Sequence, residues 1–365
     1  MVLVLAAILT SIYAIVFSIF IFCLLRLRNR HRSDQEPSVS IIVAARNEEK
    51  VIHRCLDSLS KVEYPKQKLE IILVDDQSSD RTFEIMQSYA EKQAHFKVVR
   101  ITKQIDHLKG KANAIAQGVD HSRGELIFLT DADCVVPISW VRKTVAQHDE
   151  RTGLVAGYTL LESENWFGGM QSLDWTFLHT LAAAGVGLRW PLSCFGNNLT
   201  FRRTAYNEVG GFRKIPFSVT EDFALFTAIS RRTEWDYHYL ILADTLVMSE
   251  PCTTIKELFL QKQRWAIGGL EMKLKGFLLL GLGWLLNALL LAILFLNIPL
   301  SFTLSLWALK LIIDGVLLSI PLKRLRKFSL LKFFPAFELY YYAYVLTIPF
   351  IVLFSQKVVW KGREF

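Results

Sequence analysis

The sequence predicts an α/β domain with a mainly parallel sheet and helices on both faces, joined to about four transmembrane helices. Two observations support this prediction. In the first half of the chain, short apolar runs typical of strands alternate with segments typical of helices, which is the pattern of a parallel α/β sheet. Uncharged stretches near both ends of the 365-residue chain are long enough to cross a hydrocarbon core of about 30 Å.

The uncharged stretches predict where the membrane spans lie. No charged residue occurs between Val2 and Leu25, or between Phe277 and Leu309. The second stretch is too long for one span, and Asn297 and Pro299 mark the point where it would fold back. The predicted spans are therefore Val2–Leu25, two spans that share the stretch from Phe277 to about Leu318, and Leu339–Phe354.

Two charged residues, Lys310 and Asp314, lie one helical turn apart inside the third predicted span. Ionisable residues within a membrane are candidates for function by default. The two side chains could also form a structural ion pair with each other, and the sequence leaves both interpretations open.

The positive charge of the chain is concentrated at the borders of the predicted spans. Eight basic residues account for the whole formal excess of +8, and they are Arg26, Arg28, Arg30, Arg32, Lys323, Arg324, Arg326 and Lys327. The rest of the chain is balanced, so no nucleic acid is expected as a partner. The positive-inside rule predicts a multi-pass protein of the cell (plasma) membrane with residues 33–275 on the cytoplasmic side. The first span has no basic segment before it, as expected of an uncleaved anchor.

Four segments follow from these patterns. Residues 253–275 mix apolar residues with Lys, Arg and Trp, which predicts an amphipathic helix at the membrane interface. Residues 166–187 are rich in aromatic and small side chains and are expected to form a helix against the membrane. The predicted division is 1–32 for the N-terminal anchor and its basic flank, 33–252 for the cytoplasmic α/β domain, 253–275 for the interfacial helix and 276–365 for about three C-terminal spans.

Acidic residues follow the predicted strands of the α/β domain. The strands are predicted at 38–45, 69–74, 96–101 and 126–130, with helices from about 47, 80 and 110 between them. Asp75 and Asp76 follow the second strand and Asp131 follows the fourth. Ligands bind beyond the carboxyl ends of parallel strands, so we expect these acids to converge on a binding site. Asp80 is interpreted as a helix cap.

Asp131 and Asp133 predict a metal site at the end of the fourth strand. Two carboxylates at this position, together with oxygens from a diphosphate, suit Mg²⁺ or Mn²⁺. Asp75 and Asp76 are interpreted as ligand contacts, because two adjacent acids are more than a turn requires.

Three further acidic and basic residues have two interpretations each. Lys111 lies at a helix N-terminus, where a cation opposes the helix dipole, so anion binding there is one explanation and a solvated lysine is the other. Glu221 and Asp222 precede an apolar helix. Local sequence favours capping for at least one of these acids.

Gln261, Arg264 and Trp265 are spaced i, i+3 and i+4, which places them on one side of a helix. A cation beside an indole can hold a diphosphate and stack on a ring. Arg and Trp are also common at membrane interfaces, and on local sequence alone this second interpretation is the stronger.

The ordered motifs of the chain resemble glycosyltransferase family 2, specifically its membrane-bound branch of cellulose, hyaluronan and poly-N-acetylglucosamine synthases and ceramide glucosyltransferases. The resemblance covers roughly residues 38 to 270. Its motifs are VAARNEE at 43–49, VDDQSSD at 74–80, KGKANAIAQG at 109–118, TDAD at 130–133, GNNLTFRRTAYNEVGGF at 196–212, TED at 220–222 and QKQRW at 261–265.

The resemblance implies a GT-A fold and an inverting transfer from a nucleotide sugar, with a UDP-hexose or UDP-N-acetylhexosamine as the expected donor. By this similarity the donor-binding residues are Glu48, Asp75, Asp76, Lys111, Asp131, Gln261, Arg264 and Trp265. The first three of these would hold the nucleoside, with Asp75 and Asp76 as alternatives. Asp131 and Asp133 would hold the metal.

The resemblance also implies that Asp222 is the general base, with Glu221 as the alternative assignment. The acceptor would be a membrane lipid or a growing polysaccharide. Four spans are fewer than cellulose synthase uses for its channel, so secretion of a polymer would need membrane protein partners or oligomers to complete the pore. A catalytically degenerate membrane scaffold is the alternative hypothesis. A nucleotidyl or phosphoryl transferase would leave the TED and QKQRW motifs unexplained.

Overall fold

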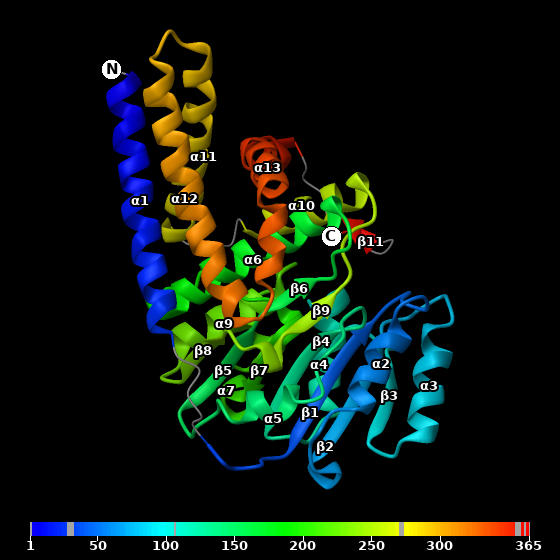
Figure 1. Cartoon of the computed structure of the whole chain (residues 1–365). Helices are drawn as coiled ribbons and strands as arrows, with labels where there is room; N and C mark the ends of the chain where they lie inside the picture. Colours follow the sequence, from blue (N-terminus) through cyan, green and yellow to red (C-terminus); the bar gives the residue numbers. More distant parts are fainter. Residues whose placement is uncertain are drawn as a thin grey trace.

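The computed structural model describes residues 2–27, 33–105, 107–269, 274–354, 359–360 and 363–364 (Figure 1). The predicted basic residues Arg28, Arg30 and Arg32 lie outside these ranges. Among the described residues, the strands are β1 Val39–Ala45, β2 Leu69–Asp75, β3 Phe96–Arg100, β4 Leu126–Asp131, β5 Thr152–Gly157, β6 Thr159–Leu161, β7 Leu199–Arg202, β8 Asp236–Leu240, β9 Val247–Ser249, β10 Val359–Trp360 and β11 Arg363–Glu364.

The α-helices of the described residues cover the sheet and form the apolar end of the molecule. They are α1 Val2–Arg26, α2 Ile52–Ser60, α3 Thr82–Lys92, α4 Gly110–Asp120, α5 Trp140–Val145, α6 Trp166–Gly187, α7 Arg203–Glu208, α8 Gly211–Lys214, α9 Glu221–Arg232, α10 Ile255–Gly268, α11 Leu274–Ala292, α12 Leu300–Arg324 and α13 Phe334–Phe354.

The central sheet has the strand order β3-β2-β1-β4-β7-β5-β8. Strands β3, β2, β1 and β4 pair in parallel, which confirms the prediction of a mainly parallel sheet. Strand β7 runs antiparallel to both β4 and β5, an arrangement that the sequence patterns did not predict. The register of β1 sets Ala45 opposite Asp75 and Ala44 opposite Asp131. The carboxyl ends of three strands therefore lie side by side.

Side chains of β1 point alternately to two separate apolar cores. Ile41 and Val43 pack in one core with Leu56 of α2. Ile42 packs in the other core with Ile115 of α4. This alternation is what a strand that is covered on both faces requires, and it confirms helices on both faces of the sheet.

The helix that was predicted to open near Asn47 begins later, at Ile52. Asn47 has a positive φ of 54°, which a helix cannot accommodate. The backbone N–H groups of Asn47 and Glu49 donate to Ser78 Oγ at 3.1 Å and Asp80 Oδ2 at 3.1 Å. The loop after β1 is therefore fixed to the loop after β2, and both loops border the carboxyl ends of the strands.

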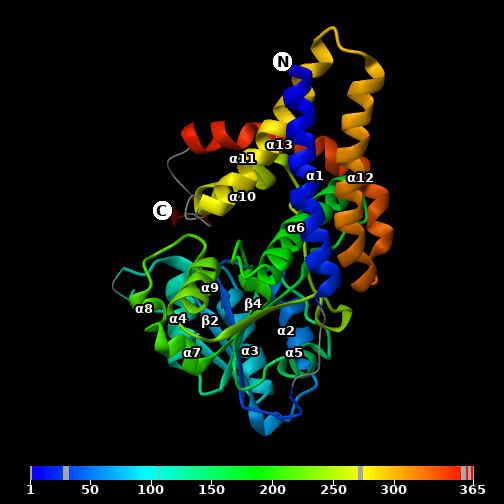
Figure 2. The ribbon, with the colours of Figure 1, turned by 90° about the vertical axis from the view of Figure 1, so that its left-hand side faces the viewer.

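In the part of the chain that the structure describes, four helices are long and apolar enough to cross a membrane, by length and composition. They are Val2–Arg26, Leu274–Phe295, Leu300–Arg324 and Phe328–Phe354, of which the second ends and the fourth begins with a short 3-10 helix. Helices α1, α11 and α12 run side by side, whereas Figure 2 shows the C-terminal part of α13 lying across them. Helix α13 begins before the predicted Leu339, because the charge of Glu338 is buried in an ion pair and does not end the helix.

A buried polar cluster joins three of these helices. Lys310 Nζ lies 2.9 Å from Asp314 Oδ2 on α12 and also contacts Glu338 Oε2 on α13. The hydroxyl of Tyr13 on α1 donates to Asp314 Oδ1 at 2.5 Å. The predicted pairing of Lys310 with Asp314 is confirmed, and Tyr13 and Glu338 complete a cluster that connects α1, α12 and α13.

Replacing Lys310 with methionine is expected to lower the free energy of unfolding by about 3–5 kcal/mol, because the buried carboxyl groups of Asp314 and Glu338 lose the cation with which both are paired. The measurement is the thermal midpoint of the full chain in detergent. Lys323→Met, at an exposed lysine on the same helix, is the control. Equal midpoints for the two variants would show that the cluster contributes nothing to stability.

Candidate active site

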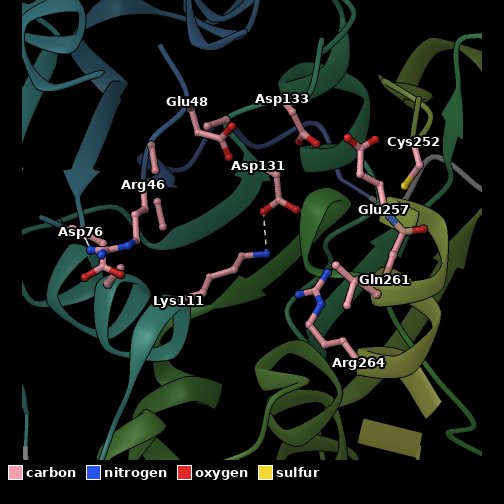
Figure 3. A pocket seen from close by; sticks show the side chains of 15 residues that line it. Arg46, Glu48, Asp76, Lys111, Asp131, Asp133, Cys252, Glu257, Gln261 and Arg264 are labelled. Atoms are coloured by element: carbon pink, nitrogen blue, oxygen red, sulfur yellow. Dashed lines mark hydrogen bonds and ion pairs between the residues drawn. The ribbon is translucent and has the colours of Figure 1, made fainter. Parts of the chain in front are cut away.

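A cavity of about 400 Å³ lies where β1 and β4 end, and Glu257, Gln261 and Arg264 of α10 form one of its sides (Figure 3). Its walls come from the loop after β1, the start of α4, the end of β4 and one side of α10. The predicted site residues that line it are Glu48, Asp76, Lys111, Asp131, Asp133, Gln261 and Arg264. The structure thus brings together residues that lie more than 200 positions apart in the chain.

Lys111 connects two acidic groups of this site. Its Nζ lies 2.6 Å from Asp131 Oδ1, as the dashed line in Figure 3 shows, and 3.2 Å from Glu221 Oε1. Burial works to lower the pKa of Lys111, but the carboxylates of Asp131, Glu221 and Asp222 outweigh burial and raise that pKa above its ordinary value. Lys111 is therefore a fixed cation between the end of β4 and the start of α9.

Asp222 is held by two backbone donors at the start of α9. Gly196 N–H donates to Asp222 Oδ2 at 2.6 Å, and Phe223 N–H donates to Asp222 Oδ1 at 2.7 Å. Burial, followed by the nearby charge of Glu221, raises the pKa of Asp222 to about 7, although Lys111 and the two N–H donors work in the opposite direction. A carboxyl group with this pKa can accept a proton near neutral pH.

Glu221 and Asp222 do not line the cavity themselves. They are connected to it through Lys111, which lines the cavity and contacts Glu221 at 3.2 Å. The two acids therefore lie next to the site and are not among its lining residues.

Asp75 and Asp76 have different surroundings. Asp75 is fully buried, where its Oδ1 accepts Ser78 N–H at 3.1 Å and its Oδ2 lies 3.3 Å from Arg100 Nε. Asp76 lines the cavity. The structure therefore brings Asp76 to the site and places Asp75 beneath it, where Asp75 fixes the loop after β2.

Trp265 is placed beside the cavity instead of among its lining residues. Its ring packs against Trp175 of α6 at a centroid distance of 5.4 Å, and Lys262 Nζ lies 4.3 Å from its ring centroid. Gln261 and Arg264 face the cavity from the same helix (Figure 3). The wall formed by α10 is thus polar toward the cavity and aromatic toward α6.

The comparisons with known proteins agree with this geometry. The family model for Glycosyl transferase family 2 matches residues 40–221, a range that includes β1, β4 and the first residue of α9. The chain belongs to glycosyl transferase family 2. It therefore carries the domain of a glycosyltransferase.

Several curated proteins are similar to this family 2 chain. The probable glycosyltransferase YdaM of Bacillus subtilis is 29% identical over 251 residues, which cover 67% of this chain and 58% of YdaM. The beta-monoglucosyldiacylglycerol synthase of Trichormus variabilis is 34% identical over 244 residues, covering 64% and 49% of the two chains. The poly-beta-1,6-N-acetyl-D-glucosamine synthase of Staphylococcus epidermidis is 28% identical over 289 residues, covering 73% and 64%. The chain thus matches less than two thirds of the length of these relatives.

A solved structure resembles the whole chain. The mannosyltransferase PcManGT from Pyrobaculum calidifontis, in complex with GDP-Man and Mn²⁺, superposes with a TM-score of 0.61 over 98% of this chain and 100% of its own. The sequence identity is 19%, so the likeness concerns the fold alone. The sheet and helices of the family 2 domain have the predicted GT-A architecture.

Some residues that line the family 2 cavity were not predicted from the sequence. Arg46 donates from Nη1 to the carbonyl oxygen of Asp76 at 2.6 Å, and its position within VAARNEE, two residues before Glu48, was an available signal. Glu257 lines the cavity from α10 and forms a capping box with Thr254. The pattern Thr-x-x-Glu at 254–257 is the sequence signature of that cap.

The residues present fit a divalent metal ion bound together with a diphosphate. Asp131 and Asp133 both line the cavity, and Asp133 Oδ2 also accepts a hydrogen bond from Ser249 Oγ at 3.3 Å. Within the described ranges, no group of three or more His, Cys, Asp or Glu side chains could hold a metal. One or two carboxylates plus phosphate oxygens and water are the usual ligands of Mg²⁺. The buried Gln261 Oε1 has no hydrogen-bond partner among the described residues, as expected of a group that meets a ligand.

Proposed function

We propose that this chain is an inverting, metal-dependent glycosyltransferase. It transfers a hexose or N-acetylhexosamine from a nucleotide sugar, with UDP as the expected nucleotide, to a lipid or polysaccharide acceptor at the membrane. The observation that carries the proposal is the cavity in which strand-end carboxylates, Lys111 and Arg264 meet, with Asp222 directly beyond Lys111. The catalytic domain lies on the cytoplasmic side of a multi-pass membrane protein in this proposal, as the basic residues at the span borders suggest.

The donor would lie across the ends of β1 and β4. Asp76 and Glu48 line the side of the cavity on which the nucleoside would bind, and Arg264 lies on the α10 side, where its charge can balance a diphosphate. Asp131 and Asp133 would hold Mg²⁺ or Mn²⁺, which neutralises charge on the leaving diphosphate when bound. Lys111 lines the cavity beside Asp131, so its ammonium group can contact the same phosphates.

Asp222 would accept the proton of the acceptor hydroxyl. As the hydroxyl oxygen bonds to the anomeric carbon, the bond from that carbon to the diphosphate oxygen breaks, and its electron pair leaves with the nucleoside diphosphate. Attack opposite the leaving group inverts the configuration. The backbone donors Gly196 and Phe223 hold the carboxylate in one orientation, and its pKa of about 7 suits a base that works near neutral pH.

Two acceptor classes remain in the proposal because the similar proteins point to both. One relative is named a monoglucosyldiacylglycerol synthase and another a poly-N-acetylglucosamine synthase. A lipid and a growing polysaccharide both present a hydroxyl group to a site that lies next to apolar helices.

The test uses the full chain in detergent with Mg²⁺ or Mn²⁺, a panel of UDP- and GDP-sugars and a membrane lipid extract. Release of nucleoside diphosphate from one donor would support the proposal and name the sugar. Extraction of the labelled product into organic solvent would separate a glycolipid from a polymer. Binding of a donor with no release under any of these conditions would contradict the transferase and favour a scaffold.

A further inference from the structure

Helix α10 forms the wall of the cavity that faces the membrane helices. Its cavity side carries Glu257, Leu260, Gln261 and Arg264, which follow the i, i+3, i+4, i+7 spacing of one helix face. Ile255 and Phe259, on the opposite face, are 77% and 47% exposed. Gln261 and Arg264 of α10 can therefore contact the donor only if this helix is held at a set distance from the sheet and from Glu221 and Asp222.

One contact fixes the middle of α10. Lys262 forms an ion pair with Asp174 of α6, and both side chains are buried. Lys262 follows Gln261 directly and precedes Arg264 by two residues. The pair therefore sets the rotation of α10 about its own axis, with Gln261 and Arg264 turned toward the cavity.

A second contact lies at the end of α10, at Gly268. The backbone conformation of the helix does not explain why this residue is glycine. Gly268 is the last residue of α10, and its φ is not in the positive range, so the backbone conformation does not require glycine. Glycine is the least favourable residue after proline in a helix. A Cβ atom at this position would lie 2.5 Å from Thr220 Cγ2, 3.2 Å from Thr220 Oγ1 and 3.3 Å from Val219 Cγ2. Close packing against the chain before α9 is what requires glycine here.

The residue that Gly268 contacts directly precedes the two catalytic acids. Thr220 is the N-cap residue of α9, and Glu221 and Asp222 form the first turn of that helix. Gly268 also lies four residues after Arg264, on the same side of α10. One close contact thus joins the helix that carries the donor-binding arginine to the turn that carries the base.

We propose that Gly268 is a positioning residue, which holds α10 against Thr220 and so sets the spacing between the groups that bind the diphosphate and Asp222. This inference rests on the proposed function. A methyl group at residue 268 would move the end of α10 away from Thr220 or displace Thr220 itself. Misplacement of reacting groups by about 1 Å can reduce a rate by roughly 10²-fold. Most donor contacts on the sheet side, including those of Asp76 and Asp131, would stay in place.

The experiment compares Gly268→Ala, Thr220→Ser and the double variant in the full chain. Serine at 220 removes the Cγ2 methyl that causes the clash and keeps the hydroxyl that lies 3.0 Å from Ser218 Oγ. We expect Gly268→Ala to lower kcat by roughly 10- to 100-fold with little change in the donor KM. In a protein that already carries Thr220→Ser, Gly268→Ala should lower kcat by a several-fold smaller factor, because residues 268 and 220 are in contact and their effects are coupled.

Gly281→Ala is the matched control, since an added Cβ at this helical glycine of α11 would have no neighbour within 4 Å among the described residues, apart from its own helix backbone and the adjoining residues. Its kcat should equal that of the wild type. A Gly268→Ala variant with wild-type kcat would overturn the inference, and so would an equal loss in both Thr220 backgrounds.

A failure of the proposed function can be distinguished from a failure of the inference about Gly268, because in the first case the wild type would release no nucleotide from any donor. The thermal midpoints of the same variants still test the contact in that case. A lower midpoint for Gly268→Ala that Thr220→Ser partly restores would support the contact between α10 and the start of α9. A midpoint that Gly268→Ala leaves unchanged, or that Thr220→Ser fails to restore, would overturn it.

Discussion

Replacing Asp222 with asparagine is expected to reduce the transfer rate by roughly 10²- to 10⁴-fold, because the acceptor hydroxyl loses the group that takes its proton. Asparagine has nearly the same shape, and its amide oxygen can accept the hydrogen bond from Gly196 N–H, while the hydrogen bond from Phe223 N–H is lost. Donor binding should therefore remain, and only the chemical step should slow. The measurement is release of nucleoside diphosphate at saturating donor, together with a separate binding assay for the donor.

Glu221→Gln is the matched control for Asp222→Asn. Glu221 contacts Lys111 at 3.2 Å, so its loss should disturb Lys111 and lower the rate less than the loss of the base. If Glu221→Gln abolishes release while Asp222→Asn does not, Glu221 is the base and the assignment to Asp222 is wrong.

The pH dependence of activity and of stability, compared between the wild type and Asp222→Asn, tests the role of Asp222 independently. Burial, and then the charge of Glu221, raises the pKa of Asp222 from its ordinary 3.8 to about 7, so kcat/KM of the wild type should fall as the pH drops below about 7. A carboxyl group with a raised pKa contributes stability that is present at low pH and lost as the pH rises toward the folded-state pKa. Asp222→Asn should therefore melt higher than the wild type at pH 8, with a smaller difference at pH 5.

Removing the divalent metal is also expected to lower the transfer rate strongly. A metal ion contributes several kcal/mol of charge stabilisation in reactions of this kind, so a chelator should lower the transfer rate by roughly 10²-fold or more. Mg²⁺ or Mn²⁺ should restore it. Asp133→Asn should raise the metal concentration that gives half-maximal activity, because Asp133 is one of two carboxylates that line the cavity after β4.

Glu91→Gln, at an exposed acid of α3, is the control for Asp133→Asn and should leave the metal requirement unchanged. Full activity in the presence of excess chelator would contradict the metal-dependent mechanism. In that case Lys111 and Arg264 would have to balance the diphosphate without a metal.

The strand ends of the site could be predicted from the sequence, but the direction of single side chains could not. The run LEIILVDD shows a strand followed by two acids, without showing which acid is the last residue of the strand. Because successive side chains of a strand point to opposite faces, a difference of one residue decides which acid reaches the cavity. The structure ends β2 at Asp75, which is buried, and leaves Asp76 at the cavity.

Contacts between distant segments account for the other differences. The charge of Glu338 suggested that the last span begins after it, since the sequence does not show that Lys310 lies beside it in space. Trp265 was expected to act with Gln261 and Arg264, but the position of α6 places Trp175 against its ring. The antiparallel strand β7 enters the sheet between β4 and β5, and strand order of this kind depends on long-range pairing that local patterns do not encode.

The cluster that joins α1 to α12 has a consequence for how the chain is made. Tyr13 and its partner Asp314 are separated by 301 positions, and Arg324 donates to the backbone carbonyl of Leu27 at 2.9 Å. The ribosome synthesises α1 long before α12 and α13. The side of α1 that carries Tyr13 therefore stays without its α12 partner until the catalytic domain between them has been made and can fold. Assembly of the membrane part is therefore the closing step of biogenesis, and premature termination before α12 would leave Tyr13 without its partner Asp314, although Phe17 of α1 could still stack on Phe177 of α6.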